Sequence, residues 1–217
     1  MSEILRTIWA GFAGATWLDQ ANLALGILGV VLMIRRTLWA FPVGLAAVGV
    51  QGVLFYRAQF PADAAVQVFF FITLAWGWRH WVSDRGEAPE LPVTRLGARG
   101  ILVTLGLAGA AMTGWVFWVA PHVGAQMPWR DAFIAAFSVA AQVLQARKVI
   151  ENWPVWLVVN AVAVASYWRA ELAYTAFLYA VYFGLAVGGW RSWRVALRAQ
   201  EKTDDDVSTD ELKGVRE

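Results

Sequence analysis

The chain contains an internal repeat: shifted by 112 positions, the sequence matches itself without a gap. Of the 65 positions from 17 to 81, 18 are identical in the second copy, more than shared hydrophobic composition alone explains. A chain made of two copies of one unit should fold into two similar halves, so the repeat constrains every other expectation. The most informative pairs are Trp17 with Trp129, Asp19 with Asp131, Arg35 with Arg147, Pro42 with Pro154 and Gly77-Trp78-Arg79 with Gly189-Trp190-Arg191.

The composition indicates a lipid environment. Apolar residues make up 59% of the 217 and charged residues 16%, proportions typical of an all-α integral membrane protein rather than a soluble domain. Cysteine is absent, which excludes disulfides, cysteine-ligated metal sites and a thiol nucleophile. Residues 1–16 lack a cationic start and a small-residue cleavage site, so we expect an interfacial segment rather than a signal peptide.

Seven segments are apolar enough for transmembrane helices, each close to the roughly 20 residues that a bilayer requires. Seven spans and the repeat fit one arrangement: three helices, one unpaired linker helix and three helices, which leaves the two copies parallel. The expected spans are 18–34, 38–56, 63–81, 100–120, 129–146, 152–168 and 172–192. The expected units are a first repeat at 17–82, a cytoplasmic loop at 83–99, a linker helix at 100–120, a second repeat at 129–194 and a disordered cytoplasmic tail at 195–217.

Basic residues set the expected orientation. Of the 18 lysines and arginines, 14 follow the first, third, fifth and seventh spans, and only Arg6, Arg57, Arg130 and Arg169 lie on the other side. By the positive-inside rule, the N-terminus is outside and the C-terminus cytoplasmic. The basic residues therefore serve as topology signals, and we expect a lipid bilayer around the chain and no nucleic-acid partner.

The sixth expected span carries the clearest candidate site. Trp153, Trp156 and Asn160 are separated by three and four residues, so they project from one helical face. An amide in hydrocarbon needs a hydrogen-bond partner, and two indoles beside it suit a flat aromatic ligand with hydrogen-bonding groups. The alternatives are an interfacial tryptophan belt and an interhelical hydrogen bond.

Other spans place polar and aromatic residues at similar helical spacing. A stripe of Ser138, Gln142 and Gln145 lies on the fifth span, with interhelical hydrogen bonding as the alternative role. The repeat mates of Trp153, Trp156, Asn160 and Tyr179 are Phe41, Gly44, Val48 and Gln67. The two copies therefore differ at these positions, as one asymmetric ligand between two related halves would require. The predicted substrate-binding residues are Trp153, Trp156, Asn160, Gln67, Phe71, Thr175, Tyr179 and Gln51.

Two elements, ENWPVWLVVN and QVFFFITLAWGWRHW, resemble the PnuC family of vitamin transporters over about residues 16–195. The resemblance implies a SWEET-like fold and passive uptake of nicotinamide riboside across the bacterial inner (plasma) membrane. It also implies trapping of the substrate by a cytosolic riboside kinase, a homotrimer, and thiamine or riboflavin as substrates of relatives. Two residues depart from the family pattern: Trp76 stands where tyrosine is usual, and Pro154 replaces an aliphatic residue.

Functions of other classes are less compatible with the sequence. A retinal protein needs a Schiff-base lysine in its last helix, and none is present there. The chain has two histidines, His80 at the end of the third expected span and His122 between spans, and no acidic pair within the spans, so we expect no catalytic residue, metal or cofactor. No acidic residue lies mid-span to couple protons. A membrane sensor or scaffold that binds without transport stays open.

Overall fold

The computed structural model describes residues 3–57, 61–123 and 127–214, which form helices with one isolated parallel bridge between Thr94 and Val149. Each expected span coincides with a helix, and an additional short helix, α1, precedes them. The helices are α1 (Glu3–Gly14), α2 (Trp17–Ile34), α3 (Ala40–Arg57), α4 (Pro61–Ser83), α5 (Ala98–Gly114), continued by the π-helix η1 (Trp115–Val119) and α6 (Ala120–Val123), α7 (Pro128–Ala146), α8 (Asn152–Arg169) and α9 (Ala173–Gly214).

By length and composition, four of the described helical segments are apolar enough to cross a membrane. They are α2, α3, the continuous helix from Ala98 to His122, and α9 as far as Thr203. The other three expected spans correspond to α4, α7 and α8. These helices contain 23, 19 and 18 residues, so each is about as long as a transmembrane helix. That all seven expected spans cross the membrane remains a prediction.

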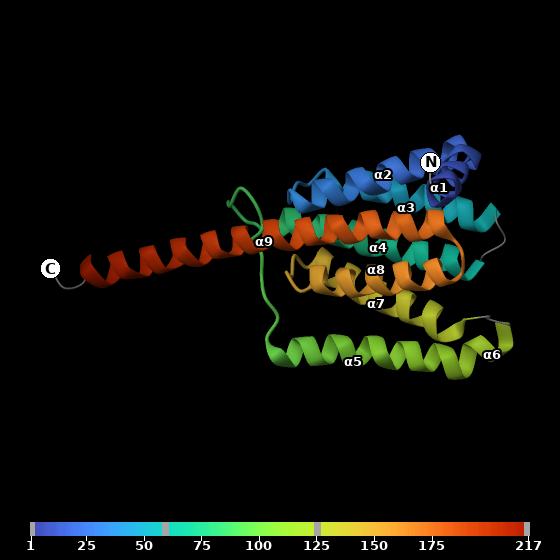
Figure 1. Cartoon of the computed structure of the whole chain (residues 1–217). Helices are drawn as coiled ribbons and strands as arrows, with labels where there is room; N and C mark the ends of the chain where they lie inside the picture. The colour runs from blue at the N-terminus through green and yellow to red at the C-terminus, as the bar shows by residue number, and fades with distance from the viewer. Residues whose placement is uncertain (1–2, 58–60, 124–126, 215–217) are drawn as a thin grey trace.

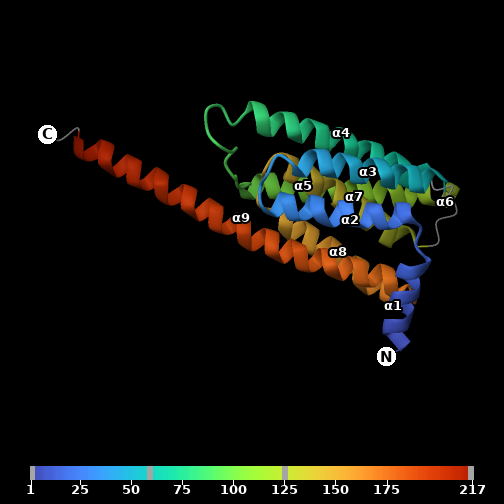
Figure 2. The same cartoon turned by 90° about the horizontal axis from the view of Figure 1, so that it is seen from above.

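Six helices form a closed ring, and the repeat explains its order. In space α2 contacts α3, α3 contacts α4, α4 contacts α7, α7 contacts α8, α8 contacts α9, and α9 returns to α2 (Figure 1). The α4–α7 and α9–α2 contacts are equivalent in the repeat, so each copy closes on the other in the same way. Helix α5 packs outside the ring against α7 (Figure 1), and α1 packs at an angle against the start of α9 (Figure 2).

Four aromatic residues join the two repeats at the basic end of the ring. Phe41 packs edge-on against Trp81 at 5.0 Å, and their repeat mates Trp153 and Trp193 pack edge-on at 5.5 Å. A 6.0 Å contact between Trp81 and Trp193 links the pairs. All four side chains are at most 2% exposed, so these residues, here called the aromatic quartet, form the centre of the core.

The quartet also supplies reciprocal hydrogen bonds. The Trp81 indole donates to the carbonyl of Ala146 at the end of α7, at 2.9 Å, and the Trp193 indole donates to that of Met33 near the end of α2, at 3.1 Å. Carbonyls in the last turn of a helix lack partners within the helix, so the Trp81 bond satisfies a group that α7 leaves open. The Met33 carbonyl accepts from the Arg36 N–H as well, at 3.0 Å. The last helix of each repeat thereby holds the first helix of the other.

The turns after α2 and α7 share an unusual backbone conformation. Arg36 and its repeat mate Lys148 adopt positive φ values of 58° and 56°, which glycine usually occupies at a helix C-terminus. In both turns the next residue donates back to the helix, Thr37 to Leu32 at 3.2 Å and Val149 to Leu144 at 2.9 Å. The repeat therefore extends to turn geometry, although both positions carry a cation instead of glycine.

The C-terminal segment differs from expectation. Disorder was predicted for 195–217, but α9 continues as one helix to Gly214 and projects beyond the bundle (Figure 1). The stretch from 195 to 202 is rich in alanine, leucine, arginine, glutamine and glutamate, which favour helix. Leu197 is buried, and Glu201 lies 3.6 Å from Arg95 of the preceding connection. Packing and propensity thus account for helix over 195–202, where composition alone indicated a solvated tail.

Candidate functional site

Helices α7 and α8 present a buried polar face within an otherwise apolar bundle. Ser138, Gln142 and Asn160 are 8%, 7% and 5% exposed. The Trp156 indole donates to the Gln145 side-chain oxygen at 2.9 Å, which fixes the relative level of the two helices. Because α7 and α8 are consecutive and antiparallel, one turn forward along α8 to Asn160 corresponds to one turn back along α7 to Gln142. These five residues are called the α7–α8 polar face.

Gln142 has an open hydrogen-bonding group. Its Nε2 is buried and has no hydrogen-bond partner among the residues that the structure describes. An unpaired buried donor costs about 1–3 kcal/mol, so such a group is a natural position for a ligand or an ordered water. Gln142 belongs to the polar stripe expected on the fifth span, but it was not among the predicted binding residues. The sequence does not show which stripe residues have a hydrogen-bond partner. That information comes only from the packing of α7 on α8.

At the equivalent positions the first repeat carries apolar residues and glycine. Val30 and Val48 occupy the positions equivalent to Gln142 and Asn160, and Gly26 and Gly44 those equivalent to Ser138 and Trp156. A Cβ placed on Gly29 of α2 would lie 3.7 Å from the backbone of Gly44 of α3, which shows how close these helices are. The polar face therefore belongs to one half of the ring only.

The predicted site residues of α8 take two different positions. Trp156 is half-buried and Asn160 buried on the polar face. Trp153 is instead part of the aromatic quartet, where its ring packs over Gly189 and against Trp193. Its Nε1 has no partner within the described residues. The structure thus brings Trp156 and Asn160 together with α7, and it places Trp153 in the inter-repeat core.

The remaining predicted residues are spread around the ring. Tyr179 of α9 stacks on Tyr167 of α8, with ring centroids 5.4 Å apart, and half-buried Thr175 lies one turn before it. Gln67 of α4 is half-buried against Gly52 of α3.

The last two predicted residues lie apart from the α7–α8 polar face. The Gln51 side-chain oxygen accepts a 2.5 Å hydrogen bond from Asn22, which ties α3 to α2. Phe71 of α4 is 46% exposed on the apolar surface. Neither residue contributes to the polar face in this structure.

A charged cluster lies at the basic end of the ring. The two carboxylate oxygens of Glu90, in the connection between α4 and α5, contact Arg36 at 3.4 Å and Lys148 at 3.3 Å. Lys148 is fully buried, donates to the Leu91 carbonyl and lies 4.5 Å from the centre of the Trp81 ring. Burial lowers the pKa of Lys148, and the Glu90 charge opposes that change. This group of Arg36, Glu90 and Lys148 is called the Glu90 clasp, because one carboxylate holds equivalent cations of both repeats.

The chemistry of these residues favours binding rather than catalysis or metal coordination. Within the described part of the chain, no group of three or more His, Asp or Glu side chains could hold a metal ion. The acidic residues have structural partners: Asp19 caps α2 through Thr16, Asp131 pairs with Arg130 at 2.7 Å, and Glu151 accepts from the Leu96 backbone. The α7–α8 polar face instead offers an indole, amides and a hydroxyl, which suit a neutral or cationic ring with hydrogen-bonding substituents.

Comparisons with known proteins agree with this interpretation. The family model described as nicotinamide mononucleotide transporter matches residues 16–195. The riboflavin/roseoflavin transporter RibM of Streptomyces davaonensis is 27% identical over 190 residues, covering 86% of this chain and 88% of that protein. The nicotinamide riboside transporter PnuC of Escherichia coli is 24% identical over 211 residues, with the same coverage.

A solved structure has the same fold. The crystal structure of the vitamin B3 transporter PnuC matches with a TM-score of 0.71 at 20% sequence identity. The match covers 91% of each chain. The arrangement of the helices is therefore that of a known membrane transporter, and none of these similarities points to an enzyme.

Proposed function

Since the chain belongs to the nicotinamide mononucleotide transporter family, a family of membrane transporters, we propose that it carries nicotinamide riboside across the membrane. The α7–α8 polar face is the observation that supports this proposal most directly. It combines a half-buried indole with buried amides on one side of a duplicated ring. Transporters built from repeats usually bind their substrate between the two repeats near the middle of the bilayer. In this proposal the polar face supplies the second repeat's part of such a site, and Gln67 of α4 supplies the part of the first.

The chemistry of nicotinamide riboside fits these residues. Its pyridinium ring is flat and cationic, so it would stack on the Trp156 indole through dispersion and cation–π attraction. The carboxamide both donates and accepts, which matches Asn160 and the open donor of Gln142. In this proposal Gln67, Thr175 and Tyr179 contact the ribose as the ring closes around it. Trp153, Gln51 and Phe71 have scaffold roles.

The transport mechanism that we propose is facilitated diffusion by alternating access. An intramembrane carboxylate is the common coupling group for protons, and the acidic residues described above lie at helix ends with structural partners. The two repeats would rock about the site, and a cytosolic riboside kinase would trap the substrate by phosphorylation. We further propose that the chain crosses the bacterial inner membrane seven times, in a three-plus-one-plus-three arrangement with the N-terminus outside. We also propose that it forms a homotrimer.

Riboflavin is a second candidate substrate, because a riboflavin transporter is among the relatives at 27% identity. Its isoalloxazine ring is also flat and carries amide-like groups that Asn160 and Gln142 could bind. It is larger and uncharged, so a preference for nicotinamide riboside would reflect the cation–π contribution of Trp156. Thiamine is cationic as well and belongs in the same comparison.

The test is calorimetric titration of the purified protein with nicotinamide riboside, riboflavin and thiamine. Replacing Asn160→Leu should weaken binding of the true substrate about 5- to 100-fold, the effect of losing one or two buried hydrogen bonds. The matched control is Asn22→Leu, which removes an amide from α2 and should leave the affinity unchanged. Equal affinity of Asn160→Leu and the unmodified protein would contradict the site.

Flux measurements separate a carrier from a sensor or scaffold. Protein reconstituted in liposomes should move the bound vitamin down its gradient without ATP or a proton gradient. Binding without flux would identify a sensor. Acceleration by an imposed proton gradient would contradict facilitated diffusion.

A further inference from the structure

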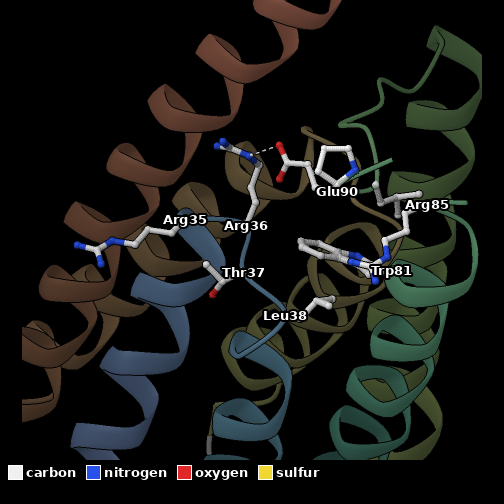
Figure 3. Close-up of a pocket in the computed structure, with 9 residues that line it drawn as sticks. Arg35, Arg36, Thr37, Leu38, Trp81, Arg85 and Glu90 are labelled. Carbon is white, nitrogen blue, oxygen red and sulfur yellow. Dashed lines mark hydrogen bonds and ion pairs between the residues drawn. The ribbon is translucent and has the colours of Figure 1, made fainter. Parts of the chain in front are cut away.

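A cavity of about 420 Å³ lies at the basic end of the ring, outside the α7–α8 polar face. The turn Arg35–Leu38 forms one wall, the end of α4 with Trp81 and Arg85 forms a second, and residues 89–91 form the third (Figure 3). This volume exceeds that of a few waters and is large enough for a small phosphorylated molecule. The transport proposal makes no use of this cavity.

The charges on the cavity walls are unbalanced. The cavity is lined by three arginines, Arg35, Arg36 and Arg85, and by one acidic residue, Glu90. The formal charge of its walls is therefore +2. Figure 3 shows Arg36 and Glu90 turned toward each other, with Arg35 directed away from them. Arg85 is partly buried, and no carboxylate pairs with it among the described residues. A partly buried guanidinium without a counter-charge favours an anionic ligand.

The second repeat shows what fills the equivalent groove there. Thr94 lies along the turn after α7, where its N–H donates to the Lys148 carbonyl at 3.1 Å and its carbonyl accepts from Ile150 N–H at 3.0 Å. The repeat mate of Ile150 is Leu38, which lines the cavity. In the described part of the chain, no acceptor is paired with the Leu38 N–H. The first repeat therefore leaves open a backbone donor that the second repeat satisfies with its own chain.

We propose that this cavity binds a phosphoryl group. A guanidinium and an open backbone N–H are the donors that bind phosphate oxygens in proteins. Arg36 would share its charge between Glu90 and the ligand, so binding would act on the Glu90 clasp that joins the repeats. The phosphoryl group could belong to a soluble phosphate ester or to an anionic lipid headgroup. Identifying that ester with the phosphorylated vitamin rests on the proposed function, whereas the phosphoryl site does not.

The test uses full-length protein in nanodiscs of neutral phosphatidylcholine, titrated with ribose 5-phosphate by calorimetry. Arg85→Gln should weaken binding at least about tenfold, and Arg85→Lys should restore part of it, because the charge is retained. The control is Arg198→Gln, an exposed arginine of α9 outside the cavity. Asn160→Leu should leave ribose 5-phosphate binding unchanged, which separates this site from the vitamin site.

A second arm tests the lipid source. Nanodiscs containing phosphatidylglycerol should compete with ribose 5-phosphate if the headgroup enters the cavity, and Arg85→Gln should remove the competition. Binding of either source that depends on Arg85 supports the phosphoryl site and identifies its ligand. Absence of binding of both, or binding equally strong in Arg85→Gln, overturns the proposal. Melting temperatures of the variants show that they are folded.

Discussion

Close packing at single residues fixes how the aromatic quartet fits between the repeats. A Cβ on Gly189 of α9 would overlap the six-membered ring of Trp153, and one on Gly77 of α4 would lie 3.1 Å from the ring of Phe41, the repeat mate of Trp153. Gly77 and Gly189 are repeat mates, and each lies four residues before the quartet tryptophan of its helix. The identity of both glycines in the repeat follows from this shared contact, since any side chain there would separate the helices.

The first prediction concerns Gly189. We expect Gly189→Ala to lower the free energy of unfolding by about 1–3 kcal/mol, because the methyl group overpacks the ring of Trp153. Thermal unfolding in detergent measures the change. The neighbouring Gly188→Ala is the control: its Cβ would lie 3.9 Å from Ile34, and alanine favours helix by about 1 kcal/mol. Equal stability of the two variants would contradict the close contact.

The sequence predicted the residues of the α8 face better than their separate roles. The spacing of Trp153, Trp156 and Asn160 predicted one shared site, but Trp153 packs against α9 whereas Trp156 bonds to Gln145 of α7. Which of the two indoles enters the core depends on where Gly189 and Trp193 of α9 lie. That is a property of tertiary packing, and a helical pattern carries no information about it.

At the scale of elements, the connection between α4 and α5 is more than the loop that its polar composition predicted. Its Thr94 backbone pairs with Lys148 and Ile150 in the turn after α7, and its Glu90 holds cations of both repeats. The sequence predicted the helices on both sides from apolar runs. It could not predict the docking, because a polar stretch looks the same whether it is solvated or bound to a helix end.

The second prediction concerns the Glu90 clasp. Glu90→Gln leaves buried Lys148 without its counter-charge, so we expect a loss of about 1–3 kcal/mol of stability. The full cost of breaking a buried pair is larger, but the Glu90 side chain is 41% exposed and its interactions are partly screened. Thermal unfolding should show a melting temperature lower by about 2–10 °C.

The matched control for the clasp is Glu87→Gln, which removes an exposed carboxylate three residues earlier in the same connection. It should leave the melting temperature unchanged, because no ion pair involves Glu87 among the described residues. A loss of equal size in both variants would assign the effect to net charge rather than to the clasp.

At the scale of the whole molecule, the repeat predicted the architecture and left one part of it open. Two copies of three helices close a ring through equivalent contacts, α4 with α7 and α9 with α2. The unpaired fourth segment was expected as a linker helix, and α5 lies outside the ring against α7. Its position could not be predicted, since a segment without a repeat mate has no internal reference for where it packs.

The third prediction concerns orientation, which decides whether the phosphoryl site faces the cytosol. The chain has no cysteine, so a single introduced cysteine reports on one position without further changes. We chose His122→Cys and Thr203→Cys, exposed positions near opposite ends of the bundle. A membrane-impermeant maleimide on intact cells should label the first and spare the second until the membrane is permeabilised.

The reason for this expectation is the distribution of charge in the sequence: 14 of the 18 basic residues follow the first, third, fifth and seventh expected spans, as Thr203 does. The cavity of Arg36 and Arg85 lies at the same end as Thr203. Labelling of Thr203→Cys in intact cells would place the cavity outside, where the product of a cytosolic kinase cannot reach it. That result would leave an external phosphate ester or a lipid headgroup as the ligand, so the labelling also tests whether transport and the phosphoryl site can be coupled.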